Sequence, residues 1–330
     1  MHIKDLGEFG LIRRLAAGER RSEAVIKGVG DDAAVLAVNP ASRLLVTGDL
    51  MVDGTHFLRD KISGFDLGYK LMAVNLSDIA AMAGTPRFAV VFLGIPDDLS
   101  VEAVEEIYRG MRALAERYEV SIVGGDTVRS PSLTLGITLL GEGDPDRTIL
   151  RSGARPDDLL AVTGTLGRSA AGLAVALGLV AAEGESALRV LVAHNRPQPL
   201  IEEGSRLGSL EGVHAMIDIS DGLASEVGHI CEESGVGAVV LGDEVPIDED
   251  TRKIGEMIGK TPLEMALFGG EDYELLFAVA PECWDTVRNE LESIGTRAAV
   301  VGRINDKAGE IVLESGGTTS KLTPGGFQHF

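Results

Sequence analysis

Cysteine is almost absent from this sequence. Its 330 residues include two cysteines, Cys231 and Cys283, and no Cys-x-x-Cys pair. We therefore expect neither a disulfide framework nor a thiolate metal site, and we expect a reducing, cytoplasmic compartment. Residues 1–10 lack a basic stretch followed by an apolar core, so no secretory signal is predicted.

Long hydrophobic runs and basic residues are also scarce. The longest apolar run, residues 170–182, is too short to span a bilayer. Lysine and arginine number 30 against 51 aspartates and glutamates, which gives a formal charge of -21. This balance argues against nonspecific binding to nucleic acid or to an anionic membrane, because both need basic patches.

Aromatic residues make up only 4% of the chain, whereas there are 42 glycines. Such a composition favours tight turns and close backbone approaches over large aromatic cores. The length suits two domains. The stretch 141–158, rich in Gly, Pro, Asp and Arg, is the predicted junction between an N-terminal domain, residues 1–148, and a C-terminal domain, residues 149–330.

Helix and strand signals alternate in both halves, which predicts an α+β fold. In the N-terminal half we expect helices over 8–17, 66–83 and 100–118, with Asp66 and Ser100 as N-caps. Strands are expected there over 33–38, 44–47, 88–95, 120–123 and 133–140. In the C-terminal half strands are expected over 159–163 and near residues 218, 238, 275, 299 and 311, and helices near 167, 187, 201, 220–233, 252 and 287.

Aspartates placed at strand ends or in glycine turns are the main chemical signal: Asp32, Asp49, Asp126, Asp218 and Asp221. Each of them alone is more typical of a surface turn. Asp78 differs, because helical spacing places it on one face with Leu71, Asn75 and Met82. That face is expected to be buried, so the Asp78 carboxylate needs either a divalent cation or hydrogen-bond donors beside it.

Together these aspartates favour metal binding. Carboxylate and hydroxyl oxygens suit Mg²⁺ rather than Zn²⁺, and Mg²⁺ usually takes one or two protein carboxylates plus phosphate oxygens. Six converging aspartates therefore predict several ions and a nucleoside triphosphate. No GxxxxGK[ST] motif is present, and Gly28-x-Gly30-x-x-Ala33 leads into a predicted strand rather than the helix of a dinucleotide fingerprint. His56 is kept as a candidate substrate contact.

Ten segments in order resemble the thiamine-monophosphate kinase family along essentially the whole chain. They are EFGLI from Glu8, GVGDDAAVL from Gly28, VDGTHF from Val52, NLSDIAAMAGTP from Asn75, GGDTVRSP from Gly124, LRSGARPDD from Leu150, VTGTLGRSAAGL from Val162, DISDGL from Asp218, GGEDYELLF from Gly269 and GGFQHF from Gly325. The resemblance implies the aminoimidazole ribonucleotide synthetase-like superfamily. It implies two α+β domains, with N-terminal sheets pairing into a barrel across a homodimer and ATP near the interface.

The reaction implied is direct, Mg²⁺-dependent transfer from ATP to thiamine monophosphate, which gives thiamine diphosphate in the last step of its biosynthesis. The family's metal ligands match Asp32, Thr47, Asp49, Asp78, Asp126, Asp218 and Asp221. Its ATP contacts match Tyr108, Gly125, Asp126, Arg151 and Ser220, and its substrate contacts match His56, Glu271 and Phe327. No covalent nucleophile or general base is expected. Gly48 departs from the family, where Thr is common, so the coordination of one ion is in question.

Two alternatives stay open. The first is a sibling enzyme of the superfamily. Selenophosphate synthetase would need a reactive cysteine or selenocysteine near the N-terminus, and the first cysteine here is Cys231. The hydrogenase-maturation relative would need a C-terminal cysteine, and this chain ends Gln328-His329-Phe330. An aminoimidazole ribonucleotide synthetase is allowed by the fold alone, although the segments from Gly269 and Gly325 favour the thiamine enzyme. The second alternative is a noncatalytic nucleotide-binding protein, which an ADP-release assay would distinguish.

Overall fold

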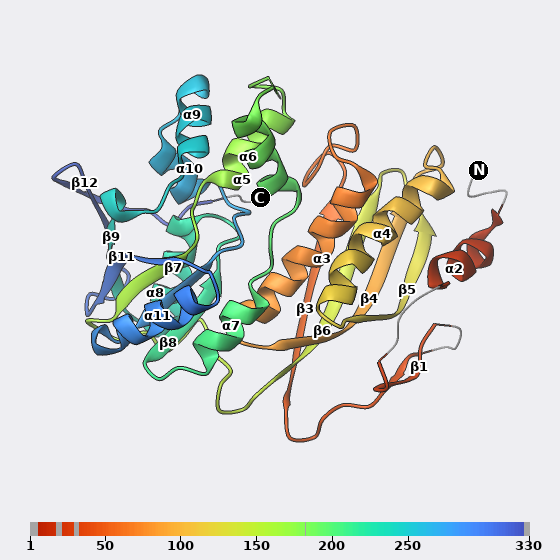
Figure 1. The fold of residues 1–330 in the computed structure, drawn as a ribbon, viewed down its shortest axis with the longest axis horizontal. Coiled ribbons are helices and arrows are strands. Elements are labelled where there is room, and N and C mark those ends of the chain that lie inside the picture. The colour runs from red at the N-terminus through yellow and green to blue at the C-terminus, as the bar shows by residue number, and fades with distance from the viewer. Residues whose placement is uncertain (1–5, 18–21, 30–32, 182, 327–330) are drawn as a thin grey trace. The chain divides into compact units, whose positions relative to one another are not determined.

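The computed structural model describes residues 6–17, 22–29, 33–181 and 183–326. The chain divides into two compact units, and Figure 1 labels most of their elements. Unit 1 comprises residues 1–79 and 85–145, and unit 2 comprises residues 80–84 and 146–330. In the described part of the chain, no helix is both long enough and apolar enough to cross a bilayer.

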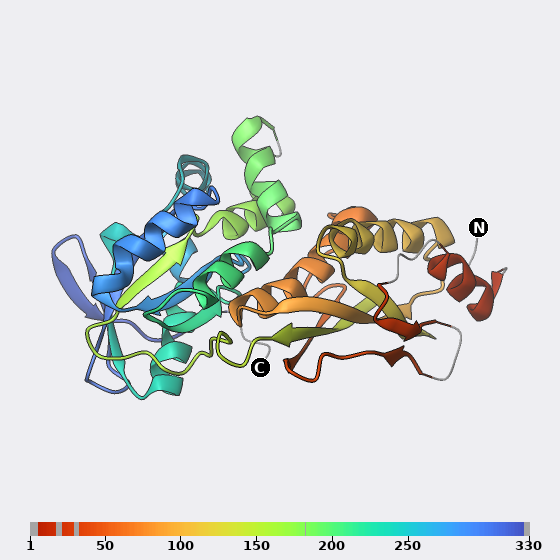
Figure 2. The ribbon, with the colours of Figure 1, turned by 60° about the horizontal axis from the view of Figure 1, so that its bottom comes forward.

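Unit 1 is built on a four-stranded sheet in the order β3-β6-β4-β5. The strands are β3 (Arg43–Val52), β4 (Thr85–Ile95), β5 (Ser121–Arg129) and β6 (Thr134–Gly143). Pairing is antiparallel except between β4 and β5. Helices α3 (Gly64–Ala81) and α4 (Val101–Arg117) lie on one face of the sheet (Figure 2). Within the described ranges the sheet is open, so no closed barrel is present.

Smaller elements complete unit 1. They are α2 (Glu8–Ala16) and the antiparallel pair β1 (Val25–Lys27) and β2 (Val35–Leu36). The helix predicted over 8–17 is thus confirmed, and Val35–Leu36 is extended rather than helical. This agrees with the rejection of a dinucleotide fingerprint after Gly28, because that motif must open a helix.

Helix α3 begins earlier than predicted. The N-cap is Ser63 rather than Asp66, because the Ser63 hydroxyl accepts from the Asp66 N–H at 3.0 Å. Asp66 instead lies in the first turn, where its negative charge interacts favourably with the positive end of the helix dipole. Ser100 caps α4 as predicted and accepts from the Ala103 N–H at 3.2 Å.

Helices α3 and α4 cross with their backbones in close contact. A Cβ atom added to Gly68 of α3 would lie 1.8 Å from the Ile107 carbonyl oxygen of α4. A Cβ atom added to Gly110 would lie 1.9 Å from the Phe65 carbonyl oxygen. Glycine at both positions therefore sets the distance between the helices, and with it the position of the α3 face that carries Asn75 and Asp78.

Strand β5 is longer than the predicted strand over 120–123. It runs on to Arg129, so Gly124, Gly125 and Asp126 are part of the sheet rather than of a loop. A Cβ atom at Gly125 would lie 1.8 Å from the Val91 carbonyl oxygen of the neighbouring strand. Of this glycine pair, which normally signals a turn, Gly125 is the residue that allows the two parallel strands to approach closely.

Unit 2 contains a seven-stranded mixed sheet in the order β13-β12-β9-β11-β7-β10-β8. The strands are β7 (Leu159–Thr163), β8 (Val213–Asp218), β9 (Gly237–Leu241), β10 (Leu275–Val279), β11 (Ala298–Asn305), β12 (Ile311–Ser315) and β13 (Thr318–Lys321). Alternate residues of its central strands enter two different cores. Leu160, Ile217 and Leu276 belong to one core, and Ala161, Met216 and Phe277 to the other.

Helices cover both faces of this sheet. The first core includes α8 (Leu223–Ser234) and α10 (Pro262–Phe268), and the second includes α7 (Ile201–Gly208) and α11 (Trp284–Ser293). A third cluster joins α10 to α5 (Arg168–Ala176), α6 (Glu185–Asn195) and α9 (Glu249–Ile258). The helix predicted from Ser220 begins only at Leu223, which leaves Ser220 and Asp221 in the turn between β8 and α8.

We predict that Gly68→Ala destabilises unit 1, although alanine normally stabilises a helix interior by about 1 kcal/mol relative to glycine. The added methyl group would overlap the Ile107 carbonyl, which should cost about 1–3 kcal/mol net in urea unfolding. Gly124→Ala is the control, because a Cβ there meets nothing within 4 Å. A rise in stability for Gly68→Ala would contradict the close crossing of α3 and α4.

Candidate functional site

Two carboxylates of unit 1 lie together between the sheet and α3. Thr47 and Asp49 are two residues apart on β3, so their side chains share the face that α3 covers. The Thr47 hydroxyl donates a short hydrogen bond to Oδ2 of Asp78 on α3. Of the two partners considered for Asp78, a hydrogen-bond donor is therefore present, and the cation stays a prediction.

Asn75 joins the strand to the helix at this point. Its side chain is fully buried. Its Oδ1 accepts from the Asp49 N–H at 3.2 Å, and its Nδ2 donates to the Leu71 carbonyl at 2.9 Å. Because both ends of the amide are satisfied, Asn75 fixes the position of Asp49 relative to the helix face that presents Asp78.

The electrostatics of the pair favour a cation. Burial, and then the negative charge of Asp78, raise the pKa of Asp49 to about 6. Near neutral pH both groups carry charge at a cost that a divalent ion would remove. Gly48 lies on the opposite face of β3 from Thr47 and Asp49, so the side chain missing there does not alter this pair.

The other site residues predicted in unit 1 lie elsewhere. Asp126 on β5 is exposed and pairs with Phe92 on β4. Across the sheet, Phe92 pairs with Gly136 and Gly136 with Leu50, so these four residues form one row perpendicular to the strands. Residues in one row share a face, so Asp126 projects from the face opposite Asp49. Tyr108 is half-buried on α4, where the Arg112 guanidinium lies 5.6 Å from its ring centre. Asp32 lies outside the described residues.

His56 lies in the turn after β3. Its Nδ1 accepts from the Val52 N–H at 3.0 Å, and its own backbone N–H donates to the Val52 carbonyl at 2.9 Å. An accepting Nδ1 places the proton of the neutral ring on Nε2. The local turn therefore fixes both the orientation of the imidazole and the nitrogen that can donate to a ligand.

In unit 2 the predicted residues Asp218, Ser220 and Asp221 gather at the end of β8. Asp218 is buried at the last position of the strand. The buried carboxylate of Glu226 accepts from the Asp221 N–H at 3.0 Å and from the Ser220 hydroxyl at 3.4 Å. Burial raises the pKa of Glu226 to about 7, against the opposing effect of these donors and of Arg151.

Arg151 belongs to the same neighbourhood. Its positive charge lowers the pKa of Glu226, which shows that the two groups interact. The segment around it is anchored on unit 2, because the Leu150 carbonyl accepts from the Met216 N–H at 3.0 Å. The Ser234 hydroxyl accepts from the N–H groups of Gly153 and Ala154, each at 3.1 Å. The exposed guanidinium thus extends from a fixed backbone.

Glu271 is held in an uncommon backbone conformation. Its φ is 58° and that of Tyr273 is 53°, in the left-handed region that non-glycine residues avoid by about 1–2 kcal/mol. The Glu271 N–H donates to the Ser220 carbonyl at 2.7 Å, and the Tyr273 N–H donates to the Ile219 carbonyl at 2.9 Å. These bonds tie the segment to the turn that carries Ser220 and Asp221.

Two neighbouring carboxylates were missed by the sequence analysis. Asp272 accepts from the N–H groups of Gly167 at 2.6 Å and Ser169 at 3.0 Å, at the start of α5. Glu274 accepts from the Thr163 hydroxyl at 2.6 Å. Burial raises the pKa of each carboxylate to about 7. Their place in the GGEDYELLF segment, beside Glu271, was the available signal.

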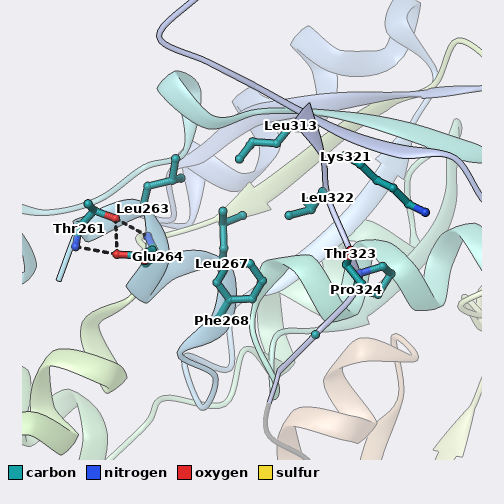
Figure 3. Close-up of a pocket in the computed structure, with 11 residues that line it drawn as sticks. Thr261, Leu263, Glu264, Leu267, Phe268, Leu313, Lys321, Leu322, Thr323 and Pro324 are labelled. Atoms are coloured by element: carbon teal, nitrogen blue, oxygen red, sulfur yellow. Dashed lines mark hydrogen bonds between the residues drawn. The ribbon is translucent and has the colours of Figure 1, made fainter. Parts of the chain in front are cut away.

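Two pockets of unit 2 lie beside the segment that follows β13. One, of about 460 Å³, is lined by Asp221, His229 and the backbone of Gly325 and Gly326. The other, of about 490 Å³, is mostly apolar, and Figure 3 shows side chains of α10 facing Leu313 and Leu322. Only the first contains a predicted site residue. Phe327, the next residue along, lies outside the described ranges.

The predicted site residues are therefore divided between the two units. Thr47, Asp49 and Asp78 meet in unit 1, and Asp218, Ser220 and Asp221 lie in one turn of unit 2. Asp126 and Gly125 occupy β5, and Glu271 contacts the Ser220 backbone. Among the residues that the structure describes, no group of three or more His, Cys, Asp or Glu lies close enough to hold an ion.

Two family models match the chain. The model for the AIR synthase related protein, N-terminal domain, matches residues 30–142, and the model for its C-terminal domain matches residues 155–314. Together they cover most of both units. The fold is therefore the two-domain α+β fold of this group, as predicted.

Individual relatives match over their full length. The thiamine-monophosphate kinase of Bacillus subtilis is 35% identical over 98% of this chain and 100% of its own. A crystal structure of thiamine-monophosphate kinase from Stenotrophomonas maltophilia has a TM-score of 0.83 and 33% identity, covering 95% and 98% of the two chains. The structure of AaThiL complexed with AMPPCP and TMP has a TM-score of 0.80 and 34% identity, covering 100% and 99%.

We predict that Asp78→Asn raises the melting temperature of the metal-free protein at pH 8 by about 2–4 °C. The pKa of Asp49 is raised, so its charged form destabilises the fold above pH 6, and this cost disappears as the pH falls towards 4. The amide oxygen of the substituted side chain can still accept from Thr47. The gain should therefore shrink at pH 4, as measured by thermal unfolding.

The same variant should lose the stabilisation that Mg²⁺ gives to the unaltered protein, because one of two charges is gone. Asp60→Asn is the matched control, since Asp60 is exposed in unit 1 and pairs with Lys61. A metal-free Asp78→Asn protein that melts lower and still gains stability from Mg²⁺ would contradict the assignment.

Proposed function

This chain belongs to the thiamine-monophosphate kinases, within the AIR synthase related proteins, and we propose that it transfers the γ-phosphoryl group of ATP directly to thiamine monophosphate with Mg²⁺. The products are ADP and thiamine diphosphate, the last step in making that cofactor. One observation carries this proposal: the chain matches AaThiL, solved with AMPPCP and TMP, over 100% of its length.

The residues of unit 1 fit Mg²⁺. Thr47, Asp49 and Asp78 offer hydroxyl and carboxylate oxygens, and the raised pKa of Asp49 reflects a charge that lacks neutralisation. We assign the metal ligands to this set, to Asp32 and Asp126, and to Asp218 and Asp221 in unit 2. When bound, Mg²⁺ would neutralise phosphate charge and hold phosphate oxygens in position.

The acceptor needs no general base. The second pKa of a phosphate monoester is near 6, so the acceptor is mostly dianionic at neutral pH and its oxygen is already a nucleophile. The barrier is the repulsion between two anions and the cost of aligning them. Arg151, a fixed positive charge beside the Ser220 turn, reduces that repulsion without transferring a proton.

A covalent phosphoenzyme is not required. The thiol of Cys231 is buried, and burial raises its pKa to about 11, so its nucleophilic thiolate is scarce at neutral pH. In our assignment the ATP contacts are Tyr108, Gly125, Asp126, Arg151 and Ser220. The substrate contacts are His56, through its Nε2–H, and Glu271, together with Phe327.

We also propose that two copies of the chain pair through unit 1. Five large apolar side chains, exposed by 44–61%, lie on the sheet face that α3 and α4 leave uncovered: Leu44, Val46, Leu50, Phe92 and Val128. Strand β3, which carries three of them, is also an edge of the sheet and is ten residues long. Such a face and edge favour pairing with another sheet, and a second copy supplies an identical one.

The compartment that we propose is the cytoplasm. Both cysteines are free in the structure, one buried in unit 2 and one half-buried. A chain that carries free thiols and no disulfide is typical of a reducing environment.

We predict that the purified protein releases ADP from ATP with thiamine monophosphate and only at background rate with thiamine. The hydroxyl of thiamine is a neutral alcohol and would need a base, and its binding would leave charges meant for phosphate unpaired. Asp49→Asn and Asp78→Asn should reduce turnover by at least about a hundredfold, and Asp60→Asn should not.

Incubation with ATP labelled on its γ-phosphate should leave no label on the protein. Equal use of thiamine and its monophosphate, or a labelled enzyme that forms and decays at the rate of turnover, would overturn direct transfer. ATP-dependent activity on neither acceptor would favour a sibling enzyme or a nucleotide-binding protein.

We predict a homodimer in sedimentation velocity at micromolar concentration. Val46→Glu combined with Leu50→Glu should shift it to monomer, because two charges would then lie on the apolar face. Met257→Glu in unit 2 is the control, since Met257 is 70% exposed on α9, which is not part of that sheet. A monomeric unaltered protein with full activity would refute the pairing.

A further inference from the structure

A buried histidine of unit 2, His194, contacts two segments that are distant in the sequence, at Ser169 and at Glu271. His194, near the end of α6, is 6% exposed. Its Nδ1 lies 2.9 Å from the hydroxyl oxygen of Ser169 on α5 and 3.4 Å from Oε2 of Glu271. His194 has no role in the mechanism described above. It nevertheless contacts Glu271, the carboxylate to which we assign substrate binding.

The histidine completes a ring of contacts around Glu271. The Ser169 N–H donates to Asp272 at 3.0 Å, while the Ser169 hydroxyl meets His194. Two consecutive carboxylates, Glu271 and Asp272, are thereby tied to one residue of α5. The Glu271 N–H in turn donates to the Ser220 carbonyl at 2.7 Å. Backbone and side chain of Glu271 are held from different directions.

The imidazole itself has little freedom to move. Helices α5 and α6 pack so closely that a Cβ at Gly172 would lie 2.1 Å from the Val190 carbonyl oxygen and 2.5 Å from the Cβ of His194. An imidazole fixed in this way can restrict the orientation of a side chain that contacts it. Glu271 is such a side chain: it is 31% exposed, so one part contacts His194 while another faces solvent.

We propose that His194 is a positioning residue, which holds the Glu271 carboxylate in the orientation that binds the ring system of the acceptor. The proposal rests on the function proposed above. Thiamine monophosphate carries a cationic thiazolium and an aminopyrimidine, and both favour a fixed carboxylate as partner. Nδ1 of His194 hydrogen-bonds to the Ser169 hydroxyl at 2.9 Å, and the same nitrogen lies 3.4 Å from Oε2 of Glu271, so the ring holds that carboxylate oxygen on its own side.

Two amide substitutions separate positioning from packing. Asparagine at this position places an NH₂ group near the position of Nδ1, whereas glutamine places it near Nε2. His194→Gln should therefore raise the KM for thiamine monophosphate about tenfold, and His194→Asn should stay within about threefold of the unaltered protein. In both variants the KM for ATP and the melting temperature should change little.

The partner is tested by a double-mutant cycle. In a Glu271→Ala background, His194→Gln should add less than about a twofold change in the KM for thiamine monophosphate, because the group that it positions is gone. Equal increases in both KM values, identical behaviour of the Asn and Gln variants, or a full His194→Gln effect without Glu271 would overturn the proposal.

A measurement without substrate tests the contact itself. The ring ¹⁵N chemical shifts of His194 should change in Glu271→Ala, since Nδ1 would lose its charged neighbour. Unchanged shifts would overturn the proposal whatever the enzyme phosphorylates. Failure of the proposed function would instead appear as absent turnover of thiamine monophosphate by the unaltered protein while these shifts still respond.

Discussion

Repulsion between two neighbouring carboxylates is the constraint on which the site of unit 1 depends. Asp49 and Asp78 are brought together by a strand and a helix, and Asn75 locks the strand to that helix. Burial and the mutual charge raise the pKa of Asp49 to about 6. Holding two such carboxylates together costs electrostatic free energy, and a divalent cation that prefers oxygen ligands removes this cost. The close crossing of α3 and α4 at Gly68 and Gly110 keeps that arrangement in place.

In unit 2, backbone and carboxylate hydrogen bonds instead fix the conformation of one segment, residues 271–274. Glu271 and Tyr273 take left-handed backbone angles, and their N–H groups bond to the turn after β8. Asp272 and Glu274 bond to the two ends of the β7–α5 connection. The strained segment is therefore held on several sides, and strain of this kind persists only where the surroundings determine it. That is the setting in which we place substrate recognition.

Much of the fold could be predicted from local patterns. Strand β7, the Ser100 cap of α4 and the Gly167 start of α5 follow from apolar runs and capping residues. Errors arose where tertiary contacts override local preference. Gly124 and Gly125 have the composition of a turn but lie in β5, where the neighbouring strand β4 leaves no room for a Cβ at Gly125. The α10 helix, only seven residues long, was missed.

For the site, too, local sequence patterns predicted some residues, and tertiary contacts determined the rest. Residue type and order pointed to Asp49, Asp78 and Asp221, and the family resemblance added Thr47 and Ser220. The structure brings Thr47, Asp49 and Asp78 together in unit 1 and Ser220 and Asp221 together in unit 2. Sequence spacing could not show that Asp126 projects from the opposite face to Asp49, because strand register decides it. Nor could it find Glu226, Asp272 or His194, whose roles depend on contacts between distant segments.

In our proposal the carboxylates of Asp49 and Asp78 bind a divalent ion together with nucleotide phosphates. Mn²⁺ titrated into the metal-free protein and followed by electron paramagnetic resonance tests it most directly, with and without AMPPCP. We expect the sharp signal of aqueous Mn²⁺ to be lost on binding, and the nucleotide analogue to increase both the number of ions bound and their affinity. An aqueous Mn²⁺ signal that stays at full intensity in the presence of protein and analogue, beyond the loss caused by the analogue alone, would contradict it.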